Sequence, residues 1–142
     1  MNVLLVTSVA AVVADPPQSR RLFMGALGLP LEGEGVDGYY SSGSIPGCNH
    51  FGVWPLSQAA EACFGTPEWP ADRTVPQVSI EFEVESPEAV AEAGEELQQE
   101  GYELLHSARK EPWGQTVARI LTDDGVIVGI SYAPPFHEDE PA

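Results

Sequence analysis

The fold is decided by a ten-residue stretch that occurs twice, as SVAAVVADPP at residues 8–17 and as SIEFEVESPE at residues 79–88. Both copies begin with serine and continue as a strand-like run, and the second follows the first at an offset of 71 residues. The copies end in Asp15-Pro16 and Ser86-Pro87. Because Asp and Ser are good helix N-caps and proline suits the first helical position, the repeat predicts two strand-to-helix units in one chain.

The helix that follows each strand can be bounded from its apolar residues and its terminating glycine. The first is predicted over residues 16–27, before Gly28, with an apolar stripe of Leu22, Phe23, Ala26 and Leu27. The second is predicted over residues 87–100, before Gly101, and should bury Val90, Ala93 and Leu97.

Three more strands are predicted after each helix, bounded by glycine-rich turns. They cover residues 31–34, 39–42 and 49–54 in the first half, and 102–106, 115–121 and 126–132 in the second, with a tight turn at residues 123–125. Each half is then β-α-β-β-β, which predicts an α+β fold. We expect one domain, with a first module at about 1–56, a linker containing a short helix at about 57–74, a second module at about 75–133 and an acidic tail at 134–142, of which the end HEDEPA should be frayed.

Composition excludes several classes of protein. The chain has 142 residues and a formal net charge of −16, which would repel a phosphate backbone, so nucleic acid is not an expected partner. No apolar run approaches the roughly 20 residues that span a bilayer, so no membrane partner is expected. Cys48 and Cys63 have neither CxxC nor zinc-site spacing, which favours reduced thiols and a cytoplasmic location. The opening residues 1–15 lack a positively charged segment and are interpreted as a strand rather than a signal peptide.

The tandem β-α-β-β-β pattern, with LGLPLE at residues 27–32, PWGQ at 112–115 and DDG at 123–125, resembles the vicinal oxygen chelate superfamily. That superfamily includes glyoxalase I, extradiol dioxygenases and bleomycin resistance proteins. The resemblance implies curved half-barrel sheets around a ligand cavity, commonly completed within a homodimer.

The resemblance also implies where a metal would bind, because the metal enzymes of this superfamily take ligands from the first and last strands of each module. The matching positions here are Ser8, Gly52, Ser79 and Gly129. Catalytic Zn, Fe, Ni or Mn sites need about three imidazole or carboxylate ligands, and these four residues supply none. We therefore expect no metal and no other cofactor, and neither glyoxalase I nor extradiol dioxygenase chemistry.

Strand alternation indicates what lines the cavity instead. If Ser79 faces inward, Glu81 and Glu83 do so too, while the intervening apolar residues pack on the helices. The two carboxylates are equally compatible with recognition of a ligand and with a salt bridge to an inward Arg119. One of these partners should exist, because an unpaired carboxylate there would cost several kcal/mol or take up a proton.

Four further residues are candidates for ligand contact. His50 and Trp54 share the face of Gly52, whose missing side chain should leave room for a planar ligand stacked on Trp54. The resemblance places the turn at 111–115 near the cavity mouth, where Trp113 and Gln115 would touch a ligand, although Trp113 could equally cap the core from outside. A structural role for His50 is also open. His106 and His137 are expected to be peripheral, and Tyr39 cannot be placed.

Three functional hypotheses follow. The first is a metal-free small-molecule binding protein of the bleomycin-resistance type, sequestering a cationic or aromatic compound and acting as a homodimer. The alternative is a lyase, isomerase or dioxygenase-like enzyme of the same superfamily, either metal-free with His50 and Glu81 or Glu83 as the acid/base pair or using a displaced metal site. The third is an association domain with a vestigial cavity.

Overall fold

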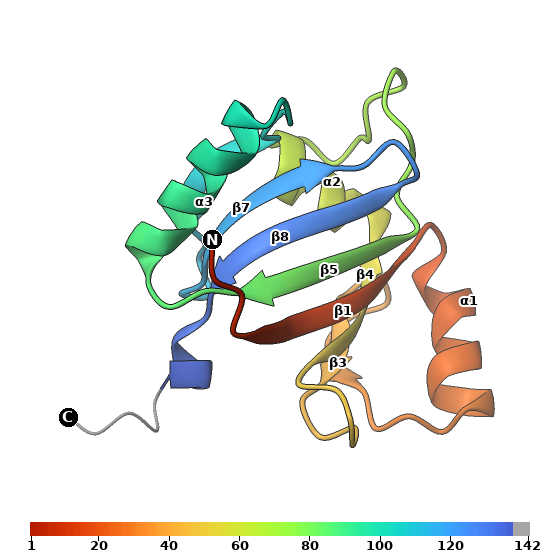
Figure 1. Ribbon diagram of the computed structural model, residues 1–142. Coiled ribbons are helices and arrows are strands. Elements are labelled where there is room, and N and C mark those ends of the chain that lie inside the picture. The colour runs from red at the N-terminus through yellow and green to blue at the C-terminus, as the bar shows by residue number, and fades with distance from the viewer. Residues whose placement is uncertain (138–142) are drawn as a thin grey trace.

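The computed structural model describes residues 1–137, which form one curved, unclosed eight-stranded sheet with three helices packed around it (Figure 1). The strands lie in the order β2-β3-β4-β1-β5-β8-β7-β6. Their bounds are β1 Leu5–Val13, β2 Glu32–Gly33, β3 Tyr40–Ser42, β4 Phe51–Pro55, β5 Val78–Glu83, β6 His106–Lys110, β7 Thr116–Leu121 and β8 Val126–Tyr132. The predicted α+β class and the twofold β-α-β-β-β order are confirmed.

The helices are α1 Pro16–Arg20, which continues as the π-helical segment η1 Arg21–Ala26, then α2 Leu56–Phe64 and α3 Pro87–Gln99. A 3₁₀ turn, η2 Pro134–His137, follows the last strand. Of the acidic end HEDEPA at 137–142, which was predicted to fray, His137 belongs to this turn, and the other residues lie outside the described part of the chain. Within residues 1–137, no helix is long and apolar enough to cross a membrane.

The helix starts form as the repeated sequence predicts. The Asp15 side chain accepts a hydrogen bond from the Gln18 amide at 3.2 Å, and the Ser86 hydroxyl accepts one from the Ala89 amide at 3.0 Å. Each cap satisfies a backbone N–H that would otherwise have no partner in the first turn. The caps thus direct the chain out of β1 and β5 at equivalent points.

Strand register confirms that the two modules correspond. At the antiparallel junction between β1 and β5, Ser8 lies opposite Glu81 and Ala10 lies opposite Ser79. In the repeat, Ser8 corresponds to Ser79 and Ala10 to Glu81, so these two pairs are equivalent when the modules are interchanged. In the parallel pairs, Ala10 lies beside Gly52 and Glu81 lies beside Gly129. The two glycines therefore occupy equivalent positions in the two modules.

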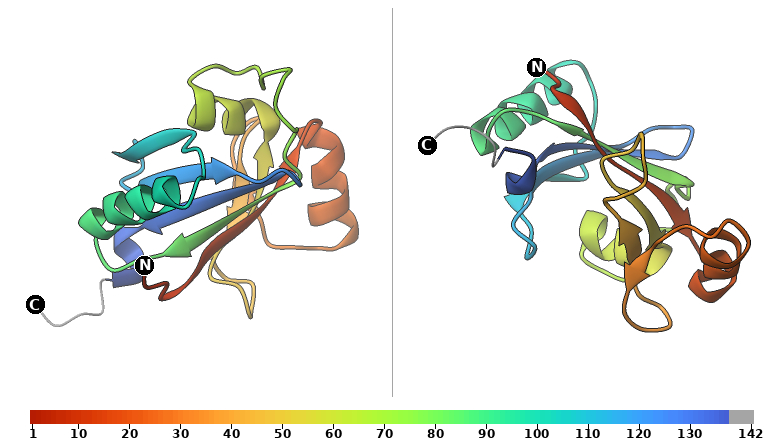
Figure 2. Two further views of the ribbon diagram at one scale, coloured as in Figure 1. Left: turned by 45° about the horizontal axis from the view of Figure 1, so that its top comes forward. Right: turned by 90° about the horizontal axis from the view of Figure 1, so that it is seen from below.

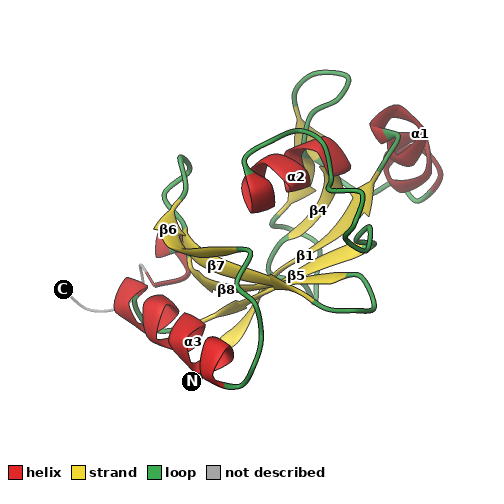
Figure 3. Cartoon of the chain, turned by 90° about the horizontal axis from the view of Figure 1, so that it is seen from above, coloured by secondary structure: helices red, strands yellow, loops and turns green. Residues whose placement is uncertain are grey.

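Helices α3 and α2 lie on opposite faces of the sheet (Figures 2 and 3), and an apolar cluster packs under each. On one face, α3 buries Val90 and Ala93 against Val84 of β5 and Ile130 of β8. On the other face, α2 packs Ala59 and Cys63 against Ile127 of β8. Ile127 and Ile130 point to opposite sides because side chains alternate along a strand. Gly129 shares the parity of Ile127 and so faces the side of α2, which is the concave side.

Two predicted elements were wrong in part. The apolar stripe of the first helix is not a core face, since Leu22 is 52% and Leu27 is 58% exposed, and the ring of Phe23 alone packs on an aromatic neighbour, Phe51, at 5.8 Å. The strand predicted at residues 102–106 begins only at His106, because the preceding residues cap α3 and pack on it. The Tyr102 amide donates to the Leu97 carbonyl, and the Leu104 side chain lies against Gly94.

Candidate functional site

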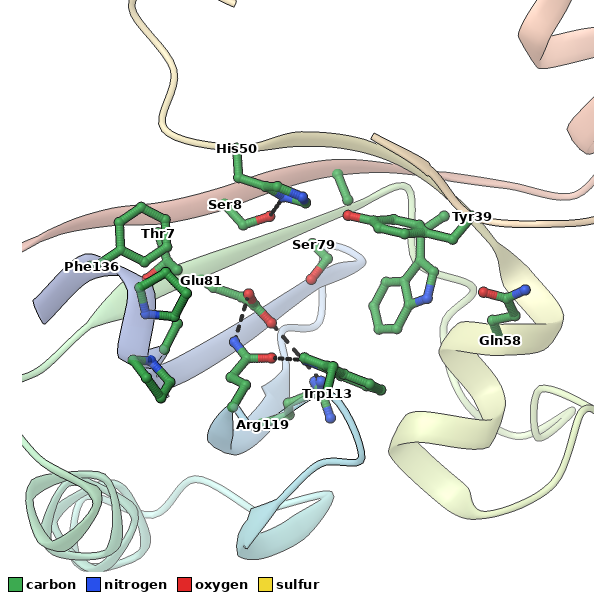
Figure 4. A pocket seen from close by; sticks show the side chains of 16 residues that line it. Thr7, Ser8, Tyr39, His50, Gln58, Ser79, Glu81, Trp113, Arg119 and Phe136 are labelled. Carbon is green, nitrogen blue, oxygen red and sulfur yellow. Dashed lines mark hydrogen bonds and ion pairs between the residues drawn. The ribbon is translucent and has the colours of Figure 1, made fainter. Parts of the chain in front are cut away.

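A cavity of about 500 Å³ opens on the concave face where the two modules meet (Figure 4). Its floor is formed by polar side chains of the central strands, including Ser8, Ser79 and Glu81. Aromatic side chains surround this floor from four separate segments: Tyr39, Trp54, Trp113 and Phe136. The volume and the mixture of aromatic walls with few polar groups are typical of sites for small organic ligands.

The structure brings six of the seven predicted site residues together around this cavity. They are His50, Trp54, Glu81, Trp113, Gln115 and Arg119. Strand alternation places the residues of β4, β5 and β7 correctly, because their inward parity is fixed by the burial of their neighbours against the helices.

Glu83 is the predicted site residue that does not line the cavity. Its side chain is fully buried, and its carboxylate accepts hydrogen bonds from the Thr7 hydroxyl at 2.8 Å and from the Ala133 amide. Its Oε2 also lies 2.8 Å from Nε2 of His137. Glu83 therefore anchors the C-terminal segment, whose Phe136 forms one cavity wall, and His137 has a defined structural contact rather than a peripheral position.

The space left by Gly129 is used by Glu81. A Cβ atom at position 129 would lie 3.0 Å from Cγ and 3.6 Å from Oε2 of Glu81. Glu81 comes from the neighbouring strand, in register with the glycine, so its side chain can lie flat across the sheet at this point. Substitution of a larger residue at 129 would displace the carboxylate.

A chain of hydrogen bonds fixes one oxygen of the Glu81 carboxylate. The Trp113 indole N–H donates to Oε1 of Gln115 at 2.8 Å, and Nε2 of Gln115 donates to Oε1 of Glu81 at 2.9 Å and to the Ser131 hydroxyl at 2.8 Å. Burial raises the pKa of Glu81, against the charge of Arg119 and the hydrogen bond from Gln115.

Arg119 is the cation of the cavity, but most of its charge is directed at another acid. Its Nη1 donates to Oε1 of Glu111 at 3.1 Å and to Nε2 of His106 at 3.0 Å. Its Nη2 lies 3.9 Å from Oε2 of Glu81, which is beyond hydrogen-bond distance. A salt bridge between Arg119 and Glu81 or Glu83 was one predicted alternative. The closer ion pair of Arg119 is instead with Glu111, a residue that the sequence did not indicate.

The pKa values of Glu111 and His106 are both lowered, which favours a charged carboxylate and a neutral imidazole. Although burial opposes it, the hydrogen bond from Arg109 and the charge of Arg119 hold the pKa of Glu111 below its usual range. Burial lowers the pKa of His106, and its neutral ring can accept from Arg119 through Nε2. The side of the cavity behind Arg119 is therefore a paired ionic network.

The room expected at Gly52 is taken by the protein itself. A Cβ atom at position 52 would overlap the hydroxyl of Tyr39, whose ring lies over the glycine and stacks on His50 with centroids 6.1 Å apart. No planar ligand can occupy this place while Tyr39 does, so that prediction was wrong. Burial, reinforced by the charge of Glu81, raises the pKa of the Tyr39 phenol.

His50 makes one polar contact inside the cavity, between its Nδ1 and the Ser8 hydroxyl at 3.1 Å. Burial lowers the pKa of His50, which favours a neutral imidazole. The ring is thus held between a serine hydroxyl and the face of Tyr39 (Figure 4).

A metal at the positions implied by the resemblance does not fit the residues found there. Ser8 is engaged with His50, Tyr39 covers Gly52, and the side chain of Glu81 lies over Gly129. Within residues 1–137 there is no group of three or more His, Cys, Asp or Glu side chains placed to hold an ion. The donor set therefore does not match a catalytic transition-metal site, which needs about three such ligands.

Two β-α-β-β-β modules are joined edge to edge in one sheet, with a cavity at their junction. A sequence model of the Glyoxalase/Bleomycin resistance protein/Dioxygenase superfamily matches residues 5–130. The chain belongs to this superfamily.

Solved structures share the fold at low sequence identity. A glyoxalase/bleomycin resistance protein/dioxygenase superfamily member from Vibrio splendidus is 14% identical, with a TM-score of 0.55 over 89% of this chain and 98% of that one. A methylmalonyl-CoA epimerase variant from Streptomyces coelicolor is 11% identical, with a TM-score of 0.56 over 92% and 94% of the two chains. At these identities the similarity shows the fold alone. No curated protein sequence matches this chain.

Proposed function

We propose that this protein is a metal-independent binding protein of the bleomycin-resistance type, which sequesters small aromatic cations. The observation that carries the proposal is the Glu81 carboxylate on the floor of a cavity whose walls are Tyr39, Trp54, Trp113 and Phe136. A carboxylate attracts a cation, and aromatic faces stack on a planar group and stabilise the positive charge.

Long-range electrostatics support the same class of ligand. The formal net charge of −16 produces a negative field that increases the rate at which cations are captured and slows the approach of anions. Arg119, which would otherwise attract an anion, is 1% exposed and already paired with Glu111. The accessible charge in the cavity is therefore that of Glu81.

Calorimetric titration with a panel of aromatic cations, anions and neutral compounds of matched size tests the proposal. We expect cations alone to bind with measurable affinity, and Glu81→Gln to weaken their binding by about tenfold or more, as expected for loss of an ionic hydrogen bond. Glu92→Gln on the exposed side of α3 makes the same change in net charge and should leave binding unchanged. Binding of anions or neutral compounds alone would contradict the proposal.

An enzymatic function of the same superfamily is the second candidate, because the cavity also contains an acid/base arrangement. The Ser8 hydroxyl holds a His50 whose pKa is lowered, and the same cavity contains Glu81, whose pKa is raised. A neutral imidazole and a carboxyl group of this kind can exchange a proton with a bound carbon acid. Deuterium incorporation into a bound compound in heavy water, abolished by His50→Asn with binding retained, would favour this candidate over simple sequestration.

We also propose that the protein acts as a homodimer in a reducing compartment such as the cytoplasm. The exposed Leu22 of η1 and Leu27, which follows it, form an apolar surface that a second copy could cover. Cys48 and Cys63 are free thiols in the structure, as expected in a reducing compartment.

A further inference from the structure

We infer that the cavity is selective for cations that carry an N–H donor, such as protonated primary amines, over quaternary ammonium compounds of the same shape. This inference rests on the proposed function and specifies the chemistry of its ligand. It is carried by the unequal surroundings of the two Glu81 oxygens.

The first oxygen of the carboxylate is already occupied. Oε1 accepts the hydrogen bond from Gln115, whose amide cannot be reversed without turning its N–H group toward the indole N–H of Trp113. Nε2 of Gln115 is held a second time by the Ser131 hydroxyl at 2.8 Å. The Glu81 carboxylate is therefore fixed in orientation from one side.

The second oxygen is left as an acceptor for a ligand. Within the described part of the chain, no hydrogen bond reaches Oε2, and the nearest cation is Nη2 of Arg119 at 3.9 Å. The Glu81 side chain retains 15% exposure, and the residue lines the cavity. An anionic oxygen that is partly desolvated but not hydrogen-bonded gains most from a charged donor placed at about 2.8 Å.

Arg119 cannot take over this role. Its side chain is 1% exposed, and its Nη1 is engaged by Glu111 and His106. Its Nε is buried without a partner among residues 1–137, and its Nη2, the donor nearest to Oε2, stays 3.9 Å away, beyond hydrogen-bond distance. Movement of Arg119 toward Oε2 would break the shorter ion pair with Glu111.

Aromatic stacking alone does not offer an equal site to a quaternary ammonium group. The guanidinium of Arg119 already lies over the Trp54 ring, 5.7 Å from its centroid, so a second cation near that ring meets a like charge. A methylated nitrogen also keeps its charge further from Oε2 and leaves that oxygen without a donor. The ammonium N–H group is therefore the feature that the cavity can distinguish.

The test uses a matched pair of probes, 2-(2-naphthyl)ethylamine and its N,N,N-trimethyl derivative, titrated calorimetrically into the full-length protein. We expect the primary amine to bind at least about tenfold more tightly, as one ionic hydrogen bond implies. Glu81→Gln should reduce the difference to within about twofold, whereas the control Glu92→Gln should preserve it.

The outcomes separate this inference from the function on which it rests. Equal binding of both probes, lost in Glu81→Gln, overturns N–H selectivity and leaves the proposed capture of cations intact. Failure of both probes and of the wider cation panel to bind overturns the proposed function itself. Tighter binding of the trimethyl derivative overturns the inference, because it would show that aromatic contacts outweigh the free oxygen of Glu81.

Discussion

Glu81 should stabilise the complex with a cationic ligand but lower the stability of the ligand-free protein. Burial raises its pKa in the folded protein above the unfolded value of about 4.3, so the fold is destabilised by the ionised carboxylate that captures the cation. The stability of the wild-type chain then falls as pH rises through the folded pKa and is fully retained below the unfolded one. We predict that Glu81→Gln raises the melting temperature by a few degrees at pH 7, and that this gain vanishes by about pH 4.

Thermal denaturation of both proteins between pH 4 and pH 8 checks this prediction. Glu92→Gln, on the exposed side of α3, should show no comparable gain at any pH. A Glu81→Gln variant that melts below the wild type at pH 7 would show that the ion pair with Arg119 outweighs the cost of burial.

Gly52 and Tyr39 should be coupled energetically. A methyl group at position 52 overlaps the Tyr39 hydroxyl, so Gly52→Ala forces the ring to move and should cost about 2 kcal/mol of unfolding free energy. In a chain that already carries Tyr39→Ala, the same substitution should cost close to zero. Urea denaturation of the four proteins of this double-mutant cycle measures the coupling.

Gly25→Ala provides the matched control for a glycine that has nothing within 4 Å of its added Cβ. It should not be destabilising, because alanine is favoured over glycine inside a helix. Equal costs of Gly52→Ala in the two backgrounds would mean that the Tyr39 ring does not fill that space.

The single residues that sequence could place are those on regular strands. Parity along β5 locates Ser79 and Glu81, and the repeat aligns Gly52 with Gly129. The sequence could not show that Tyr39 fills the space at Gly52 and Glu81 the space at Gly129. Tyr39 comes from a loop, and Glu81 comes from the strand beside Gly129. Glu83 has the correct parity, but the segment that covers it, Ala133 and η2, follows β8 and gives no periodic signal.

At the scale of elements, the C-terminal segment should depend on its anchor. His137 contacts Oε2 of Glu83 and stacks on Tyr132 with centroids 4.3 Å apart, and Phe136 beside it lines the cavity. We predict that His137→Ala accelerates exchange of the amide hydrogens of Ala133 and Phe136 and weakens binding of an aromatic probe severalfold, while exchange in α3 is unchanged. Unaltered exchange in that segment would show that the Ala133 amide and Pro134-Pro135 hold it without His137.

Elements whose signals are local were predictable, and those that depend on packing were not. The capped starts of α1 and α3 and the strand pair β7 and β8 are determined by residues adjacent in sequence. By contrast, residues 102–104 have strand-like composition but cap α3 and pack on it. The apolar face of η1 has helical periodicity, yet nothing in this chain covers Leu22 and Leu27 among the described residues.

At the scale of the whole molecule, the antiparallel junction of β1 and β5 joins the modules into one sheet, so the cavity lies at the seam. Its walls come from both modules and from α2 and the C-terminal segment. Neither module alone determines such a cavity. Strand periodicity therefore predicted the polar residues of its floor but not the loop and C-terminal residues that form its walls.

The uncovered face of η1 leads to a prediction about assembly. Leu22 and Leu27 are 52% and 58% exposed and follow Arg20 and Arg21, two of only six basic residues in a chain with 22 acids. A second copy of this acidic chain offers complementary charge to those arginines and apolar surface to the leucines. Multi-angle light scattering should therefore give a mass of about 30 kDa, twice the 15.2 kDa of the chain.

Leu22→Glu combined with Leu27→Glu should reduce this mass to that of the monomer, because each carboxylate would be buried in an interface without a partner. Val36→Glu, at an exposed position in the loop between β2 and β3, should leave the dimer intact. A wild-type protein that stays monomeric at every concentration would show that this apolar face is simply solvated.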